Sequence, residues 1–191
     1  VDGAIVMGFD GREPRDLRVA AVEAHHDRAV DADIDGPRTG SVMSENEEGA
    51  RLAVRHLHEL GHERIATITG MLGTRPGADR LDGYGYELAD LGLELPAEYV
   101  VEGDFYDESG YRGTRQLLEL DKPPTAIFAA SDLMAAGALR AANELGVRVP
   151  DDVAVVGFDD IGLASLITPQ LTTVRQDMHA LGAAAAEGLA R

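Results

Sequence analysis

Residues 125–160 read TAIFAASDLMAAGALRAANELGVRVPDDVAVVGFDD and contain one complete strand–helix–strand unit. The apolar run at 125–129 is too short for a helix, which indicates a buried strand. A helical period over 132–145 ends at Gly146, a residue that commonly stops a helix. A second apolar run follows at 153–158. Two buried strands joined by a helix are typical of a parallel sheet.

The same alternation continues in both directions along the chain. We expect the helix at 44–60 to begin with a capping box, in which Ser44 and Glu47 bond each other's backbone N–H groups. The other expected elements are strands at 3–8, 28–32, 64–69, 99–102 and 171–174 and helices at 16–25, 78–91, 108–120 and from 177. The sequence therefore predicts the α/β class with a parallel sheet.

The composition argues against several classes of protein. The chain has 191 residues, with 17 basic and 34 acidic side chains and a formal net charge of −17, which disfavours a nucleic-acid surface within it. Without any cysteine, the chain has no disulfide framework, thiol nucleophile or Cys-based zinc site. No apolar run reaches the roughly 20 residues of a membrane-spanning helix, so we expect no membrane partner.

Two short motifs allow metal-binding alternatives. Residues 58–62 read HELGH, the HExxH signature of zinc proteases. Because Gly61 is expected to end the helix, the two histidines would not face one ion. Residues 31–36 read DADIDG like the start of an EF-hand loop, but its twelfth position is Val42 rather than Glu. We therefore expect no metal, no cofactor and no catalytic residues.

Acidic, small polar and aromatic residues follow the expected strands. Since ligands bind beyond the carboxyl ends of parallel strands, these residues are candidates for a binding site. They are Phe9, Asp10, Asp31, Asp33, Thr69, Gly70, Asp104, Phe105, Ser131, Asp132, Asp159 and Asp160. Carboxylates accept hydroxyl hydrogens and an aromatic face covers the apolar side of a ring, so the set suits a neutral polyhydroxylated ligand. Capping of the following helices is the structural alternative for any one of them.

Residues 44–70 (SENEEGARLAVRHLHELGHERIATITG), 125–160 and 171–177 (LTTVRQD) together resemble the effector-binding core of the LacI/GalR family of bacterial transcription regulators. The resemblance runs over nearly the whole chain. It implies a periplasmic-binding-protein-like fold of type I, in which two doubly wound parallel-sheet subdomains enclose a ligand cleft.

The resemblance also implies a division of the chain. Residues 1–61 plus 177–191 would form an incomplete N-terminal subdomain, and residues 62–176 would form the C-terminal one. The chain would cross between them near residues 61–64 and 175–178.

Particular residues receive roles from the resemblance. Arg80 matches the effector-binding arginine, Phe105 matches the aromatic that lies against the ligand ring, and Asp159 matches the carboxylate that accepts ligand hydroxyls. Ser131 stands where many members have Asn. The expected effector site is completed by Met178, Asp31 and Phe9. For Arg80, the structural alternative is a surface arginine paired with Asp79 or Asp82.

We expect a non-catalytic sensor, in which a sugar or similar small polar metabolite changes the affinity of a regulator for its operator. A helix-turn-helix domain preceding this chain would contact operator DNA, and the regulator would be a cytoplasmic homodimer. An exported sugar-binding protein of a transporter is the alternative with the same fold. A small α/β hydrolase or a metalloenzyme is the alternative among enzymes.

Overall fold

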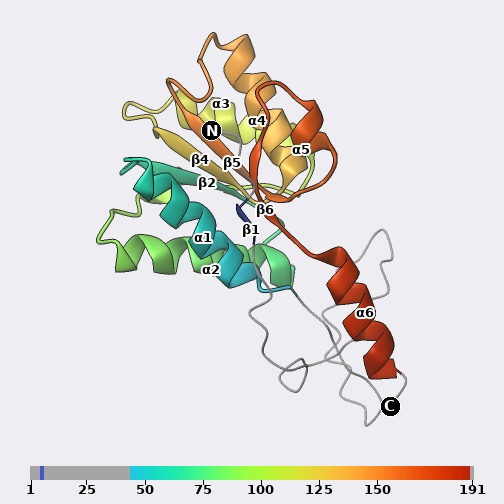
Figure 1. Ribbon diagram of the computed structural model, residues 1–191. Helices are drawn as coiled ribbons and strands as arrows, with labels where there is room; N and C mark the ends of the chain where they lie inside the picture. The colour runs from blue at the N-terminus through green and yellow to red at the C-terminus, as the bar shows by residue number, and fades with distance from the viewer. Residues whose placement is uncertain (1–4, 7–43, 190–191) are drawn as a thin grey trace.

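A single sheet of six parallel strands confirms the predicted α/β class (Figure 1). The computed structural model describes residues 5–6 and 44–189, so Phe9 and Asp31 lie outside the described residues, as do the elements expected at 16–25 and 28–32. The strands are β1 Ile5–Val6, β2 Ile65–Thr69, β3 Val100–Glu102, β4 Ala126–Ala129, β5 Ala154–Asp159 and β6 Thr172–Arg175. They lie in the order β1-β6-β5-β4-β2-β3.

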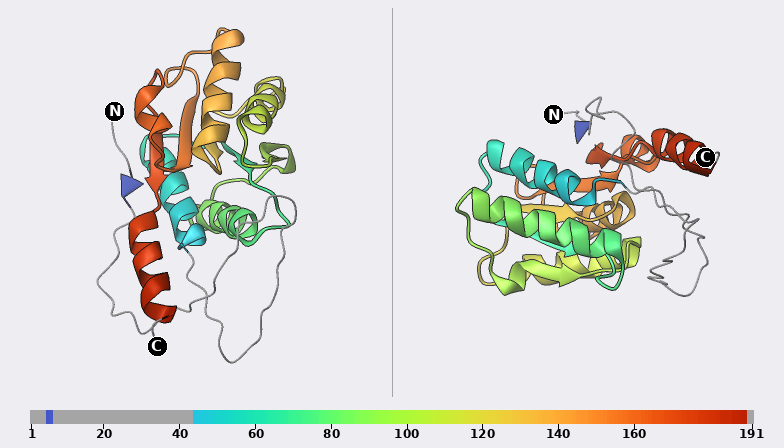
Figure 2. Two further views of the ribbon diagram at one scale, coloured as in Figure 1. Left: turned by 90° about the vertical axis from the view of Figure 1, so that its right-hand side faces the viewer. Right: turned by 90° about the horizontal axis from the view of Figure 1, so that it is seen from below.

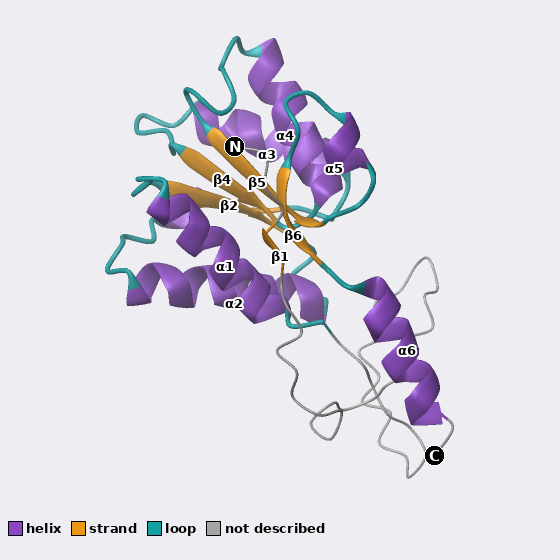
Figure 3. Ribbon diagram, viewed as in Figure 1, coloured by secondary structure: helices purple, strands orange, loops and turns teal. Residues whose placement is uncertain are grey.

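Helices cover both faces of the sheet (Figure 3). They are α1 Asn46–Glu59, α2 Arg75–Asp90, α3 Asp107–Leu118, α4 Asp132–Glu144, α5 Leu163–Leu166 and α6 Met178–Leu189, with a short 3-10 helix, η2, at Ala97–Tyr99. The pair α1 and α2 packs on one face and the pair α3 and α4 on the other, whereas α6 extends away from the sheet (Figures 1 and 2). Among the described helices, none combines the length and apolar character that crossing a bilayer requires.

The core consists of two apolar clusters, one on each face of the sheet. Alternate side chains of a strand point to opposite faces, so neighbouring residues of β4 enter different clusters. Phe128 packs with Leu57 of α1 and Tyr84 of α2, while Ile127 packs with Met134 of α4. Because helices cover both faces, every residue of β2 and β4 is buried.

The order of the strands places a topological switch point between β2 and β4. The chain passes from β2 outward to β3 and then returns to β4 on the other side of β2, after which β5 and β6 follow. Connections diverge at such a point, which opens a crevice at the carboxyl ends of the two strands. A ligand site is therefore expected at the loops that follow β2 and β4.

The helix α1 belongs to the core of this sheet. Its residues Val54 and Leu57 are fully buried in one cluster with Phe158 of β5. The predicted boundary at residue 61 would instead separate α1 from the strands on which it packs. The division into residues 1–61 plus 177–191 and residues 62–176 stays a prediction.

Two helices begin differently from the prediction. The expected capping box is wrong, because the N-cap of α1 is Glu45 and no side chain caps this end. The amide of Asn46 instead donates to the carbonyl of Ser44 at 3.3 Å. Helix α2 begins at Arg75 rather than at residue 78, because the Thr74 hydroxyl accepts from the Gly77 N–H at 3.3 Å.

The crossing of α1 and α2 requires a glycine. A Cβ at Gly83 would lie 2.1 Å from the carbonyl oxygen of Glu47, whereas a Cβ at Gly85 would find its nearest neighbour, Leu95, at 3.9 Å. We expect Gly83→Ala to destabilise the fold by about 1–3 kcal/mol through overpacking. The matched substitution Gly85→Ala should stabilise it by about 0.5–1 kcal/mol. Urea denaturation followed by circular dichroism measures both, and equal effects would contradict this packing.

Candidate functional site

Residues with strained backbone conformations lie at the carboxyl edge of the sheet. In the part of the chain that the structure describes, three non-glycine residues have a positive φ: Phe105 at 70°, Asp159 at 116° and Asp160 at 58°. Phe105 follows β3, and the two aspartates end and follow β5. Such conformations are costly and concentrate where function requires them. The strain thus marks the edge that the topology indicates.

Arg80 of α2 lies buried at the centre of this edge, with 5% of its surface exposed. Its Nε donates to Asn46 Oδ1 at 2.9 Å, and its Nη1 donates to the carbonyl of Ala130 at 2.5 Å and to Asp159 Oδ1 at 3.4 Å. The guanidinium carbon lies 3.7 Å from the centroid of the Phe158 ring. The alternative of a surface arginine paired with Asp79 or Asp82 is therefore wrong.

The ion pair of Arg80 and Asp159 can form further hydrogen bonds. Among the described residues, Arg80 Nη2 and Asp159 Oδ2 have no hydrogen-bond partner. Burial lowers the pKa of Arg80 and raises that of Asp159, and in each case the charge of the other residue opposes the shift. A ligand that both accepts and donates could satisfy Nη2 and Oδ2 together.

Gln176 donates to the same oxygen of Asp159 as Arg80 does. Its Nε2 donates to Asp159 Oδ1 at 2.5 Å, and its backbone N–H donates to the Asp159 carbonyl at 3.3 Å. The neighbouring Arg175 forms an ion pair with Asp160. The two strained aspartates are therefore bound to the last residue of β6 and to the residue that follows it.

Phe105 is held against Gly70 by its unusual backbone. A Cβ at Gly70 would lie 1.9 Å from Cζ of the Phe105 ring, so only glycine leaves room for the aromatic side chain there. The Ser131 hydroxyl donates to the Phe105 carbonyl at 2.9 Å. The ring centroid lies 5.7 Å from the guanidinium carbon of Arg80. An aromatic face is thus fixed beside the ion pair.

The hydroxyl of Ser131 is engaged within the protein. Besides donating to Phe105, it accepts from the N–H of Met134 at 3.1 Å as the N-cap of α4. Ser131 is 3% exposed, and a hydroxyl has one hydrogen to donate. A direct bond from Ser131 to an effector stays a prediction. In the structure, the Ser131 hydroxyl holds the backbone of Phe105 in place.

Asp132 is a fully buried carboxylate behind the site. It accepts from the backbone N–H of Ile161 at 2.8 Å and from the hydroxyl of Thr173. Burial raises its pKa to about 6, although both hydrogen bonds act in the opposite direction. Asp132 thereby fixes the loop that follows Asp159 and joins it to β6.

The structure brings together four of the predicted site residues, namely Arg80, Phe105, Ser131 and Asp159. Met178, at the start of α6, is 68% exposed, and its part in the effector site stays a prediction. Sequence reasoning missed two residues that hold the ion pair, Asn46 and Gln176. Gln176 stands inside the quoted LTTVRQD, but nothing local distinguishes its side chain from a solvated one.

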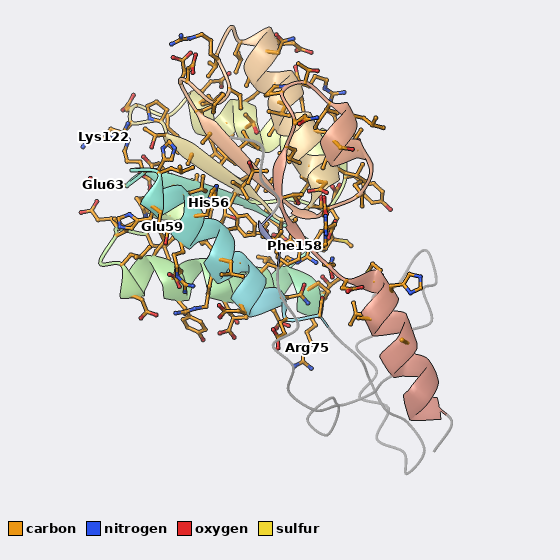
Figure 4. The ribbon with its side chains drawn as sticks, in the orientation of Figure 1. His56, Glu59, Glu63, Arg75, Lys122 and Phe158 are labelled. Atoms are coloured by element: carbon orange, nitrogen blue, oxygen red, sulfur yellow. The ribbon has the colours of Figure 1, made fainter. Side chains whose placement is uncertain are left out.

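The HELGH motif lies at the opposite edge. Helix α1 ends at Glu59, Gly61 has a φ of 93°, and His62 Nδ1 lies 3.1 Å from the Thr125 hydroxyl at the beginning of β4. Figure 4 shows Glu59 and Glu63, on either side of the end of α1, away from Phe158. Within residues 44–189, no three His, Cys, Asp or Glu side chains gather as a metal site.

Comparison with known proteins identifies the family. The model of the "Periplasmic binding protein-like domain" matches residues 54–191. The HTH-type transcriptional repressor PurR of Escherichia coli O1:K1 is 40% identical over 185 residues, which are 95% of this chain and 54% of the repressor. The chain therefore spans about half the length of the curated relatives that it matches.

Solved structures of regulators share the fold. The transcriptional regulator CelR in complex with cellobiose is 42% identical with a TM-score of 0.74, over 76% of this chain and 45% of that one. A sugar-binding LacI-family regulator from Escherichia coli, complexed with phosphate, is 34% identical with a TM-score of 0.75, over 78% and 53%. The lac repressor dimer bound to operator is 40% identical with a TM-score of 0.71, over 75% and 50%. The chain belongs to the periplasmic-binding-protein-like domain family and is homologous to the effector-binding region of LacI-family repressors.

Proposed function

We propose that this chain is the effector-sensing domain of a DNA-binding transcriptional regulator, and that an uncharged sugar binds at Arg80 and Asp159. The observation that carries the proposal is the half-satisfied ion pair, whose Nη2 and Oδ2 have no partner among the described residues. A sugar hydroxyl accepts from Nη2 while its neighbour donates to Oδ2. Phe105 offers an apolar face beside them.

The charges around the site favour a neutral ligand over an anion. Asp159 already compensates the charge of Arg80, and the negative charges of Asp159 and Asp160 raise the pKa of Asp132. An added phosphate or carboxylate would meet this negative field. The relative complexed with cellobiose supports a sugar, whereas the relative complexed with phosphate makes an anion the competing outcome of the binding test.

The sensing mechanism follows from linkage. A ligand changes the affinity for DNA only if it binds one arrangement of the regulator more tightly than another. Operator DNA is contacted by a helix-turn-helix domain outside this chain. The net charge of −17 on this chain itself disfavours contact with DNA phosphates. The regulator works in the cytoplasm as a homodimer, and the lac repressor dimer supports this assembly. The names of the relatives favour a regulator over an exported binding protein or an enzyme.

A thermal-shift assay first tests the ligand class with cellobiose, inorganic phosphate and a purine base as probes. A ligand that binds the folded chain raises its stability by about 2.7 kcal/mol at a hundred times its dissociation constant. We expect stabilisation by the sugar and none by phosphate. Stabilisation by phosphate or the base alone would contradict an uncharged sugar as effector.

An Asp159→Asn variant then tests the site. Asparagine tolerates a positive φ and can still accept from Gln176, so the fold should survive. The variant loses a charge-assisted bond to the ligand worth roughly 1.5–3 kcal/mol, and we expect cellobiose to bind ten- to a hundredfold more weakly. Calorimetry measures the change, with Asp121→Asn in an exposed loop as the control. An unchanged dissociation constant would remove Asp159 from the site.

A further inference from the structure

A continuous chain of hydrogen bonds crosses the candidate site. Asn46 Nδ2 donates to the Ser44 carbonyl at 3.3 Å, and Asn46 Oδ1 accepts from Arg80 Nε at 2.9 Å. Arg80 Nη1 donates to Asp159 Oδ1 at 3.4 Å, and the same oxygen accepts from Gln176 Nε2 at 2.5 Å. The ion pair that is proposed to bind the effector is therefore the centre of a network with two ends.

Each end of the network lies where a helix begins. Asn46 is the first residue of α1, and Ser44 lies two residues before it. Gln176 lies between β6 and α6, and Asp177 Oδ1 accepts from the Ala180 N–H in the first turn of α6. Since α6 leaves the body of the sheet (Figure 2), the second end is the point at which the chain departs from it.

We infer that Asn46 and Gln176 are positioning residues that couple the Arg80–Asp159 pair to the starts of α1 and α6. A ligand held by the pair would then act on the starts of α1 and α6 through its effect on the pair. The coupling of Asn46 to Gln176 is argued from the hydrogen bonds alone. The statement that a bound effector acts through this coupling rests on the proposed function.

The hydrogen bonds of this network are buried, which strengthens the coupling between Asn46 and Gln176. Asn46 is 4% exposed and Arg80 is 5% exposed, so breaking their bond leaves a buried donor and acceptor without partners. One oxygen of Asp159 accepts from both Arg80 and Gln176, so movement of either donor changes the bond of the other. Hydrogen bonds that share atoms in a low-dielectric surrounding reinforce one another.

A double-mutant cycle without ligand tests the coupling. The variants are Asn46→Ala, Gln176→Met and the combination, and urea denaturation gives the unfolding equilibrium constant of each. No described hydrogen bond joins Asn46 directly to Gln176, so independent residues would give additive effects. We expect the double variant to depart from additivity by roughly two- to tenfold in the equilibrium constant.

A matched cycle provides the control. Asn143 of α4 and Gln116 of α3 are exposed, and the combination of Asn143→Ala with Gln116→Met should be additive. Should the first double variant not fold, the milder pair Asn46→Ser and Gln176→Asn replaces it. Additivity in the network cycle would overturn the inference.

Hydrogen exchange with cellobiose tests the use of the network. In the wild type we expect slower exchange of backbone amides at both 45–49 and 178–182 when the sugar is bound. Asn46→Ala should reduce the change mainly at 45–49, and Gln176→Met should reduce it mainly at 178–182. Equal loss at both segments in both variants, or loss at neither, would contradict this relay. If the wild type does not bind cellobiose, the proposed sugar function fails, while the ligand-free cycle still decides the coupling.

Discussion

Replacing Arg80 by methionine is expected to lower the free energy of unfolding by about 3–5 kcal/mol, because the groups that the buried guanidinium binds lose their partner. Asn46 Oδ1 and the Ala130 carbonyl lose their donor, and Asp159 keeps a half-buried charge without its counter-ion. Methionine retains the apolar contact with Phe158 at similar length, so the loss reports polar interactions. Urea denaturation measures the change.

The same substitution should also weaken effector binding. The charge-assisted hydrogen bond from Nη2 is worth roughly 1.5–3 kcal/mol, which corresponds to a ten- to hundredfold loss in affinity for cellobiose. Arg80→Lys separates charge from geometry, because an ammonium keeps the charge but cannot bridge Asn46 and Asp159 as the planar fork does. We expect this variant to recover part of the stability and little of the binding.

Arg75, one and a half turns earlier on α2, is the control. Its side chain is 60% exposed and lies 3.6 Å from Asp79, an arrangement worth less than about 1 kcal/mol. Arg75→Met should therefore leave both stability and binding nearly unchanged. Equal destabilisation by Arg75→Met and Arg80→Met would contradict the structural role given to Arg80.

The location of the candidate site could be predicted because it depends on topology. Strands with buried runs and helices with clear periods indicate a parallel sheet, and a parallel sheet binds at its carboxyl edge. Asp159 and Phe105 follow strands in the sequence, so this rule and the resemblance both place them there. Arg80 depends on the resemblance, since an arginine within a helix has no local mark that distinguishes it from exposed Arg75.

The support of the site could not be predicted because it depends on contacts between distant residues. The segment around Asn46 has the pattern of a capping box, yet the Asn46 side chain binds Arg80, 34 residues away. The hydroxyl of Ser131 has a partner 26 residues away, which no spacing in the sequence reveals. Short-range patterns determine where elements lie, and tertiary packing decides which polar side chains are already satisfied.

Asp132 should make the stability of this chain depend on pH in the direction opposite to that of a paired carboxylate. Burial raises its pKa to about 6, whereas an unfolded aspartate titrates near 3.9. Between these values the folded chain holds a proton that the unfolded chain has released. The stability contributed by this group is therefore fully present below about pH 4 and is lost as the pH rises through 6. About two pK units correspond to about 3 kcal/mol.

Two other carboxylates lie near Asp132. Asp159 and Asp160 raise its pKa, and Asp132 in turn acts on Arg80 across the site. The contribution of Asp132 is therefore read from the difference between the wild type and Asp132→Asn. Asparagine can accept from the Ile161 N–H, and the Thr173 hydroxyl can turn to accept from its amide, so the packing is kept.

Urea denaturation between pH 4 and pH 7 measures this difference. Relative to Asp132→Asn, the wild type should gain about 3 kcal/mol as the pH falls from 7 to 4, because only the wild type takes up the proton. Asp121→Asn, in an exposed loop, should give a profile parallel to that of the wild type. Parallel profiles for Asp132→Asn as well would show that Asp132 is ionised in the folded chain throughout this range. The raised pKa would then be wrong, and the buried carboxylate would hold the Asp159 loop without responding to acid.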